Sequence, residues 1–127
     1  MVVDTSEQRI GDEDRVDRVF HALADRTRRD ILRRSMEGEL SVSALARSYA
    51  MSFAAVQKHV AVLDRAGLVS KHRHGREQLV RTDMATVQAA RHLLDEFEHV
   101  WLDRMDRFAE VLAAPVVVPP SREGEAP

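Results

Sequence analysis

Apolar residues recur at helical spacing in the first quarter of the chain. Val16, Val19, Phe20 and Leu23 lie at i, i+3, i+4 and i+7, which predicts an amphipathic helix over residues 13–24. Asp25 is a suitable N-cap for a second helix, which Gly38 is expected to end. The apolar side of that helix is formed by Ile31, Leu32, Ser35 and Met36. Two short helices, closely joined, are therefore expected to open the domain.

Two further short helices are expected in the middle of the chain. Ser41 can cap one that carries Leu45 and Ala46, and Ser52 can cap another that ends at Gly67. The apolar face of the latter is formed by Phe53, Val56, Val60 and Leu63. Only residues 49–51 separate the two helices, and amphipathic helices joined by so short a turn are typical of a helix-turn-helix.

The next segment has the pattern of a β-hairpin. Residues 68–73 and 76–81 are expected to pair around His74 and Gly75, since glycine tolerates the positive φ that a tight turn needs. A ribbon this polar is not stable alone. It is expected to be anchored through Leu68, Val69, Leu79 and Val80. The free end of the hairpin then projects as a wing.

A long helix is expected to begin at Thr82 or Asp83. Its apolar residues follow steps of three and four, and they are Val87, Ala90, Leu94, Phe97, Trp101, Met105, Phe108 and Leu112. Leu93, Val100, Leu102 and Val111 widen this strip beyond what one small domain can cover. We expect the strip to be buried against a second copy of the chain, with packing on its own domain as the alternative.

Composition narrows the class of protein. The 127 residues suffice for one domain, and with only 5 Gly and 4 Pro they favour a mostly α fold. We expect a flexible segment over 1–12, the folded domain over 13–113, and a disordered tail over 114–127. The chain has no cysteine, which excludes disulfides and thiolate sites. No stretch resembles a membrane span or a signal peptide, so a cytoplasmic location is expected.

The net charge of -2 hides an uneven distribution along the chain. Residues 41–82 carry a net charge of +5, whereas residues 1–24 carry -3 and residues 83–127 carry -5. The predicted helix-turn-helix and wing are therefore the basic part of the chain, which favours a polyanionic partner such as DNA.

The exposed face of the predicted fourth helix follows from its periodicity. Ala54, Lys58, Ala61 and Arg65 lie opposite the apolar face, with Ala55 and Gln57 beside them. In a helix-turn-helix, the N-terminal part of this helix enters the major groove, where Gln57 can pair with adenine and Lys58 can reach guanine or a phosphate. The predicted DNA-binding residues are Ser52, Ala54, Ala55, Gln57, Lys58, His59, Lys71, Arg73 and Arg76. The last three, on the hairpin, are expected to contact phosphates or the minor groove.

The chain resembles the ArsR-type winged-helix repressors between about Val16 and Phe108. The segments that carry the resemblance are 20–32 (FHALADRTRRDIL), 40–46 (LSVSALA) and 51–69 (MSFAAVQKHVAVLDRAGLV). Two positions depart from the family pattern, since Arg26 replaces a usual proline and Ala44 replaces a frequent Glu, which removes a capping box.

The resemblance implies a fold of about five helices plus a two-stranded wing that dimerises through its first and last helices. The residues expected at that dimer interface are Val16, Val19, Phe20, Leu94, Phe97, Trp101, Met105 and Phe108. It also implies a repressor, and a homodimer requires a roughly palindromic operator with half-sites about 10 base pairs apart. The apolar strip of the predicted last helix agrees with the implied dimer interface.

Many proteins of this family sense metals, and the predicted last helix carries residues that could serve as ligands. His92 and His99 lie seven residues apart on one face, with carboxylates nearby, but the family's Asp-x-His pattern is absent because Ala85 follows Met84. We expect a charged solvent face there, no metal and no cofactor. A His/carboxylate metal-responsive repressor remains one alternative, and a winged-helix module that binds proteins without binding DNA is the other. No motif of an enzyme is present.

Overall fold

The computed structural model describes the backbone of residues 5–116 and the side chains of residues 13–116. Its elements are α1 (Thr5–Leu23), α2 (Arg26–Glu37), β1 (Leu40–Ser41), α3 (Val42–Arg47), α4 (Phe53–Arg65), β2 (Val69–His74), β3 (Glu77–Thr82) and α5 (Met84–Ala113). The chain divides into two compact units, with the boundary in the sequence between His92 and Leu93, and each is described by itself. The predicted mostly α fold with a small β component is confirmed.

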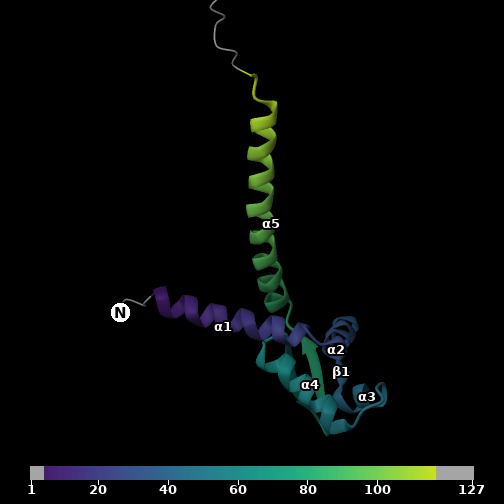
Figure 1. Ribbon diagram of the computed structural model, residues 1–127. Coiled ribbons are helices and arrows are strands. Elements are labelled where there is room, and N and C mark those ends of the chain that lie inside the picture. Colours follow the sequence, from purple (N-terminus) through teal and green to yellow (C-terminus); the bar gives the residue numbers. More distant parts are fainter. Residues whose placement is uncertain (1–4, 117–127) are drawn as a thin grey trace, which may run out of the picture. The chain divides into compact units, whose positions relative to one another are not determined.

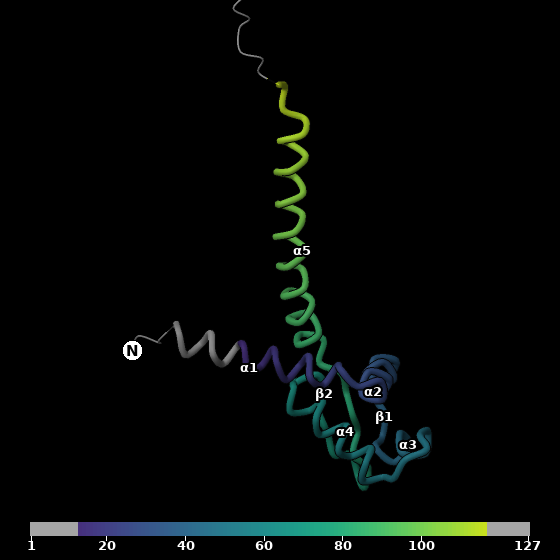
Figure 2. Tube along the Cα trace, in the orientation of Figure 1, coloured from purple at the N-terminus to yellow at the C-terminus, as the bar shows by residue number. Residues whose placement is uncertain are grey.

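The first unit is built around α4. Helix α1 packs across α2 and α4, and α3 packs beside α4 on the other side (Figures 1 and 2). The largest fully buried side chains are Ile31, Leu45, Val56, Val60, Leu63, Leu68, Val80 and Thr86. They come from α2, α3, α4, the turn before β2, strand β3 and the start of α5, so one hydrophobic core holds the helix-turn-helix and the hairpin together.

The predicted helix starts of this unit are confirmed by their hydrogen bonds. Asp25 Oδ2 accepts from the amide of Arg28 at 3.0 Å, Ser41 Oγ from that of Ala44 at 3.0 Å, and Ser52 Oγ from that of Ala55 at 3.1 Å. Each cap satisfies an amide that has no partner within the helix. Local side-chain chemistry therefore determines where α2, α3 and α4 begin.

The wing has one strand more than predicted. Strands β2 and β3 form the expected hairpin, with His74 opposite Glu77, and Gly75 turns the chain with a φ of 63°. The short strand β1 adds to the free side of β3, with Leu40 opposite Val80, which gives the order β1-β3-β2. A strand of two residues shows no alternation that a sequence pattern could reveal.

Several predictions about individual residues need correction. Helix α1 begins at Thr5 and not at residue 13, because Glu, Gln and Arg support a helix without an apolar face. Met36 and Phe53, predicted on buried faces, are each 47% exposed, since they lie in the last turn of α2 and at the first position of α4. Val19 is only 3% exposed and packs in the core of its own chain, whereas Val16 and Phe20 are half-buried.

The second unit contains most of α5. The first residues of the predicted apolar strip, Val87 and Ala90, belong to the first unit and pack in or against its core. In the second unit the strip is exposed, with exposed fractions of 53% for Leu94, 62% for Phe97, 56% for Trp101 and 59% for Phe108. Nothing within the unit covers these side chains, so a single chain leaves them in contact with water. No helix in residues 5–116 combines the length and the apolar character needed to cross a membrane. The proposed limits of the folded domain at residues 13 and 113 remain predictions, and residues 117–127 lie outside the described part.

Candidate nucleic-acid interface

Helix α4 presents its polar face to solvent, as its periodicity predicts. Ala54, Gln57 and Lys58 are exposed, while Val56 and Val60 on the other side are buried in the core. The buried side prevents α4 from rotating, so the directions of Gln57 and Lys58 follow from the core packing. Gln57 and Lys58, which are expected to contact bases, therefore lie together on the exposed side of α4.

Strand β2 carries its two cations, Lys71 and Arg73, on one face of the wing. Because side chains alternate along a strand, Lys71 and Arg73 share the face of buried Val69, whereas His72 and His74 lie on the opposite face. Opposite Arg73 on β3 lies Gln78, which shares that face. Arg76 lies in the turn after Gly75 and is exposed. Lys71 and Arg73 therefore lie on the face of the hairpin whose inner end packs against α4.

A shared hollow of about 400 Å³ joins α4 to the wing. Ala54, Gln57, Lys58 and Ala61 of α4, Lys71 and Gln78 of the hairpin, and Val42 and Val60 line it. Lys71 Nζ lies 3.9 Å from Asp64 Oδ2 at the far end of α4, which holds this lysine over the hollow. Gln78 was not among the predicted residues, and only the register of β2 with β3 reveals it.

Three of the cations predicted to contact DNA have no polar partner within the described residues. Lys58, Arg73 and Arg76 are exposed, and within the described residues no hydrogen bond or ion pair involves them. Cations without an intramolecular partner lose no internal contact when they bind a phosphate. These three charges are available to an anionic partner, and Lys71 can join them by exchanging its 3.9 Å pairing with Asp64 for a phosphate.

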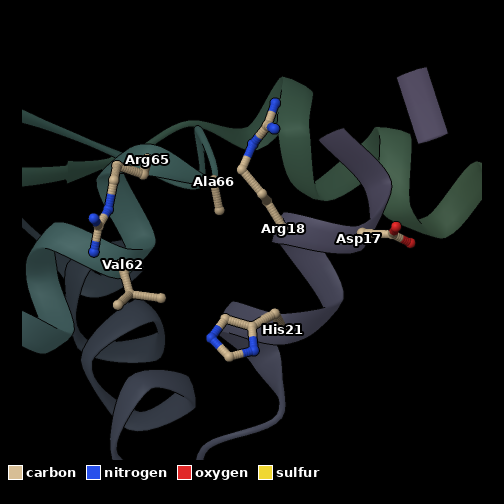
Figure 3. Close-up of a pocket in the computed structure, with 6 residues that line it drawn as sticks. All are labelled: Asp17, Arg18, His21, Val62, Arg65 and Ala66. Carbon is tan, nitrogen blue, oxygen red and sulfur yellow. The ribbon is translucent and has the colours of Figure 1, made fainter. Parts of the chain in front are cut away.

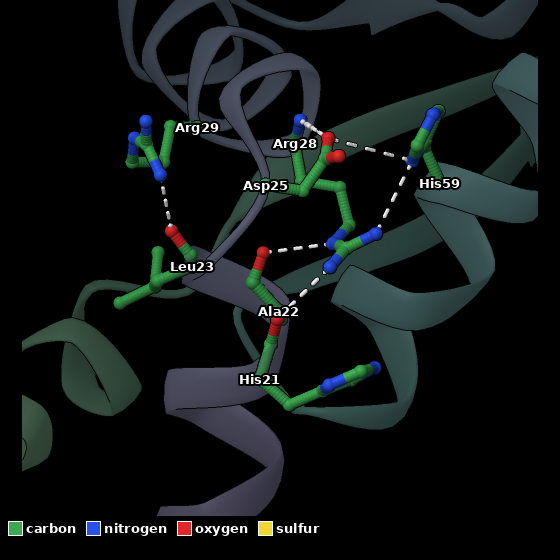
Figure 4. A network of polar contacts seen from close by, with 7 residues as sticks. All are labelled: His21, Ala22, Leu23, Asp25, Arg28, Arg29 and His59. Atoms are coloured by element: carbon green, nitrogen blue, oxygen red, sulfur yellow. Dashed lines mark hydrogen bonds and ion pairs between the residues drawn. The ribbon is translucent and has the colours of Figure 1, made fainter.

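His59, also predicted to bind DNA, lies in a structural network (Figure 4). Its Nδ1 is 3.4 Å from Arg28 Nη1 and 3.8 Å from Asp25 Oδ2. Arg28 in turn donates to the carbonyl oxygens of Ala22 at 2.8 Å and His21 at 2.9 Å. The network joins the end of α1, the start of α2 and the middle of α4. A DNA contact by His59 stays a prediction.

The Asp25 carboxylate in this network makes stability depend on pH. The hydrogen bond from the Arg28 amide, assisted by the charges of Arg28 and His59, holds the pKa of Asp25 below its usual value against the opposing effect of burial. A carboxylate with a lowered pKa contributes stability that is present above the unfolded pKa of about 3.9 and is lost as pH falls through the folded pKa.

We therefore expect Asp25→Asn to lower the free energy of unfolding at neutral pH and to lose this effect in acid. Asparagine caps a helix as well as aspartate, so the difference between the two proteins reports the charge alone. Urea denaturation from neutral pH down to about pH 3 measures it. A difference that stays constant over this range would contradict the assignment.

A second hollow, of about 420 Å³, lies where α1 packs on the C-terminal end of α4 (Figure 3). Val62 of α4 and Ala66, which follows the helix as its C-cap, provide apolar atoms, and Arg18 and His21 of α1 lie across from Arg65. The lining is mainly apolar. This hollow lies at the opposite end of α4 from Gln57 and takes no part in the surface that faces the wing.

The possible metal ligands of α5 are dispersed. His99 Nε2 lies 3.5 Å from Asp103 Oδ2, which is an ordinary i, i+4 pair at the helix surface. Within residues 13–116 of the single chain, no group of three or more His, Asp or Glu side chains is arranged to hold a metal ion.

Comparison with known proteins gives consistent matches. A family model described as "Bacterial regulatory protein, arsR family" matches residues 25–71. The HTH-type transcriptional regulator Rv2034 of Mycobacterium tuberculosis is 36% identical over 96 residues, which cover 76% of this chain and 87% of the relative.

Solved structures agree with this comparison. An ArsR-like transcriptional regulator from Rhodococcus sp. RHA1 is 31% identical with a TM-score of 0.68, and the match covers 81% of this chain and 96% of that chain. The homodimeric winged helix-turn-helix DNA-binding domain Mb0332 from Mycobacterium bovis, solved by NMR, is 28% identical with a TM-score of 0.59. That match covers 78% of this chain and 91% of the other.

Proposed function

Since this chain belongs to the arsR family of bacterial regulatory proteins, with a winged helix-turn-helix DNA-binding domain, we propose that it is a homodimeric repressor that binds a palindromic operator. In this proposal the N-terminal half of α4 enters the major groove and the β2–β3 wing follows the flanking backbone.

One observation carries the proposal, namely the hollow that α4 shares with the wing. It gathers Gln57 and Lys58 from the helix with Lys71 and Gln78 from the hairpin, although the two pairs are far apart in sequence. Gln57 offers an amide that can pair with an adenine edge, and the two lysines offer charge to phosphates or guanine. A base-reading group beside phosphate-binding groups is what sequence-specific binding requires.

The apolar strip of α5 supports the homodimer. Phe97, Trp101 and Phe108 expose aromatic surface that water does not favour, and a two-fold interface would bury each of them twice. The relative from Mycobacterium bovis is itself homodimeric. A two-fold dimer presents two copies of α4, so its operator should have two related half-sites about one helical turn apart.

In this proposal, repression results from binding of the dimer to a promoter. A dimer bound across a promoter covers DNA that RNA polymerase also needs, and this requires no further activity from the protein. A promoter that contains the selected operator should therefore be less active when the protein is present. Increased transcription from such a promoter would contradict repression while leaving DNA binding intact.

The proposal is tested by selection of binding sites from a random pool of duplexes. The expected result is enrichment of an inverted repeat, with half-sites about 10 base pairs apart between centres. Enrichment of no sequence, together with no binding to any duplex at low salt, would refute DNA recognition. That result would favour a winged-helix module with protein partners.

Gln57→Ala should lower the affinity for the selected duplex by roughly tenfold or more per half-site, because a bidentate base contact contributes about 1–3 kcal/mol. Affinity for a random duplex should change little, since that binding rests on phosphates. Fluorescence anisotropy with both duplexes measures the two effects. Gln88→Ala, at an exposed position of α5, is the matched control and should affect neither.

A further inference from the structure

Helix α2 carries a second group of cations outside the surface described above. Arg26, Arg29 and Arg33 lie at i, i+3 and i+7, so they share one face of the helix, and all three are exposed. Together with Thr27, Asp30 and Tyr49 they line a hollow of about 520 Å³. Tyr49 comes from the turn between α3 and α4, so the hollow lies between α2 and the helix-turn-helix.

The one acid in this hollow is already engaged. Asp30 Oδ2 accepts from the Tyr49 hydroxyl and from Arg34 Nε, the latter at 3.0 Å. These contacts hold the pKa of Asp30 below its usual value, while burial and the neighbouring carboxylate raise the pKa of Tyr49 to about 12. Arg34 also lies 5.3 Å from the centre of the Tyr49 ring. Asp30 is thus occupied by Tyr49 and Arg34 and forms no ion pair with the arginines of the hollow.

Two of the three arginines in the hollow lack an internal contact. Arg29 Nη1 donates to the carbonyl oxygen of Leu23 at 2.8 Å, which fixes that side chain at the end of α1 (Figure 4). Arg26 and Arg33 form no hydrogen bond or ion pair with any residue of the described part, and Arg33 acts on Asp30 only through its charge. Their planar guanidinium groups can each offer two parallel N–H donors, a geometry that matches phosphate oxygens.

The hollow lies close to the start of α4, the helix proposed to enter the major groove. Tyr49 precedes the N-cap Ser52 by three residues, so their Cα atoms lie within about 11 Å of each other. The major groove is about 12 Å wide and is bordered by phosphates on both sides. When the start of α4 lies in the groove, the arginines of the hollow can therefore reach phosphates of one bordering DNA strand.

We propose that Arg26 and Arg33 form a binding site for an oxyanion, and that its occupant is a backbone phosphate of the DNA at the edge of the groove that α4 enters. This inference rests on the proposed function, because it needs α4 to bind DNA. Each protomer contributes one such site, so a dimer gains two phosphate contacts in addition to those of the wing. The contact adds affinity and orientation and does not distinguish between sequences.

The test is the salt dependence of binding by Arg26→Gln/Arg33→Gln to a random duplex, compared with that of the unmodified protein. Each phosphate contact contributes about 0.9 to the slope of log affinity against log salt, so the slope should decrease by about 2 for the dimer. At about 0.1 M salt the same relation predicts roughly fiftyfold weaker binding. Arg18→Gln/Arg107→Gln removes equal charge at exposed positions of α1 and α5 and should leave the slope unchanged.

A charge-retaining variant separates a phosphate contact from a structural role. Arg26→Lys/Arg33→Lys should keep the slope, because lysine still neutralises a phosphate, while losing part of the affinity that bidentate contacts provide. If the glutamine double variant does not fold, as judged by circular dichroism, the single substitution Arg26→Gln at the exposed start of α2 replaces it. It should also lower the slope.

The outcomes distinguish this inference from the proposed function. An unmodified protein that binds no duplex refutes the proposed function itself. An unmodified protein that binds DNA, with an unchanged slope in the glutamine variant, overturns only the phosphate site. Calorimetric titration of the DNA-free protein with inorganic phosphate tests the alternative occupant, a free phosphorylated ligand. Phosphate binding that the variant loses while its DNA slope is unchanged would show a site for a free phosphorylated ligand, and would overturn the DNA assignment.

Discussion

Simultaneous replacement of Phe97 and Trp101 by glutamate should convert the protein to monomers. Both side chains are more than half exposed in the single chain, and they lie one helical turn apart on the same face of α5. A central aromatic residue of an interface contributes about 2 kcal/mol or more, and two-fold symmetry counts each substitution twice. The expected loss is therefore roughly 8 kcal/mol of dimerisation free energy, before the cost of burying four carboxylates.

This substitution should also weaken binding to the selected palindrome by at least about a hundredfold, because a monomer holds only one half-site. Sedimentation velocity at micromolar concentration measures the mass, and anisotropy measures the affinity. The core of the first unit contains neither residue, so its folding should be retained. A variant that remains dimeric would exclude the strip as the interface.

The control for this prediction lies on the same helix. Asp103 and Asp106 lie about 160° and 140° around α5 from Trp101, on its polar side. Asp103→Ala/Asp106→Ala removes the exposed pair of His99 with Asp103, which contributes little to stability. We expect this variant to remain dimeric and to bind the palindrome normally.

Neutralisation of the wing should have the second large effect, and it should act on all DNA sequences alike. Lys71→Gln/Arg73→Gln/Arg76→Gln removes six positive charges from a dimer. If each charge neutralises one phosphate, the slope of log affinity against log salt decreases by about 5, and affinity at about 0.1 M salt falls by more than a thousandfold. The preference between the selected and the random duplex should persist, since Gln57 is untouched.

The salt titration is made with both duplexes over the same range for the triple variant and the unmodified protein. Arg18→Gln/Arg104→Gln/Arg107→Gln removes the same charge from α1 and α5 and should change the slope little. A wing variant with an unchanged slope would show that the hairpin does not contact the backbone. A wing variant that loses its sequence preference would assign base reading to the hairpin.

The start of each inner helix was predictable because the relevant interactions are local. Asp25, Ser41 and Ser52 each accept a hydrogen bond from an amide three residues ahead, so residue type and spacing suffice to identify them. The exposed face of α4 was predictable for a similar reason, since a period of 3.6 separates Gln57 and Lys58 from Val56 and Val60. The strip of α5 follows the same rule.

Features that depend on contacts between distant segments were missed. Strand β1 exists because Leu40 lies opposite Val80, forty residues later, and two residues alone show no periodicity. Val19 was expected at a dimer interface, whereas it is only 3% exposed and belongs to the hydrophobic core of its own chain. The engagement of His59 with Arg28 likewise requires α4 to lie beside the start of α2.

By itself, then, the sequence determined the order of the helices, their caps and their apolar faces, because caps and periodicity depend on neighbours within one or two turns. The tertiary structure alone decided which polar residues share a surface. It placed Gln78 beside Gln57 across the hollow of α4 and the wing, and it placed Tyr49 beside the arginines of α2. Such groupings depend on how the core packs segments that are distant in sequence, and no local pattern records that packing.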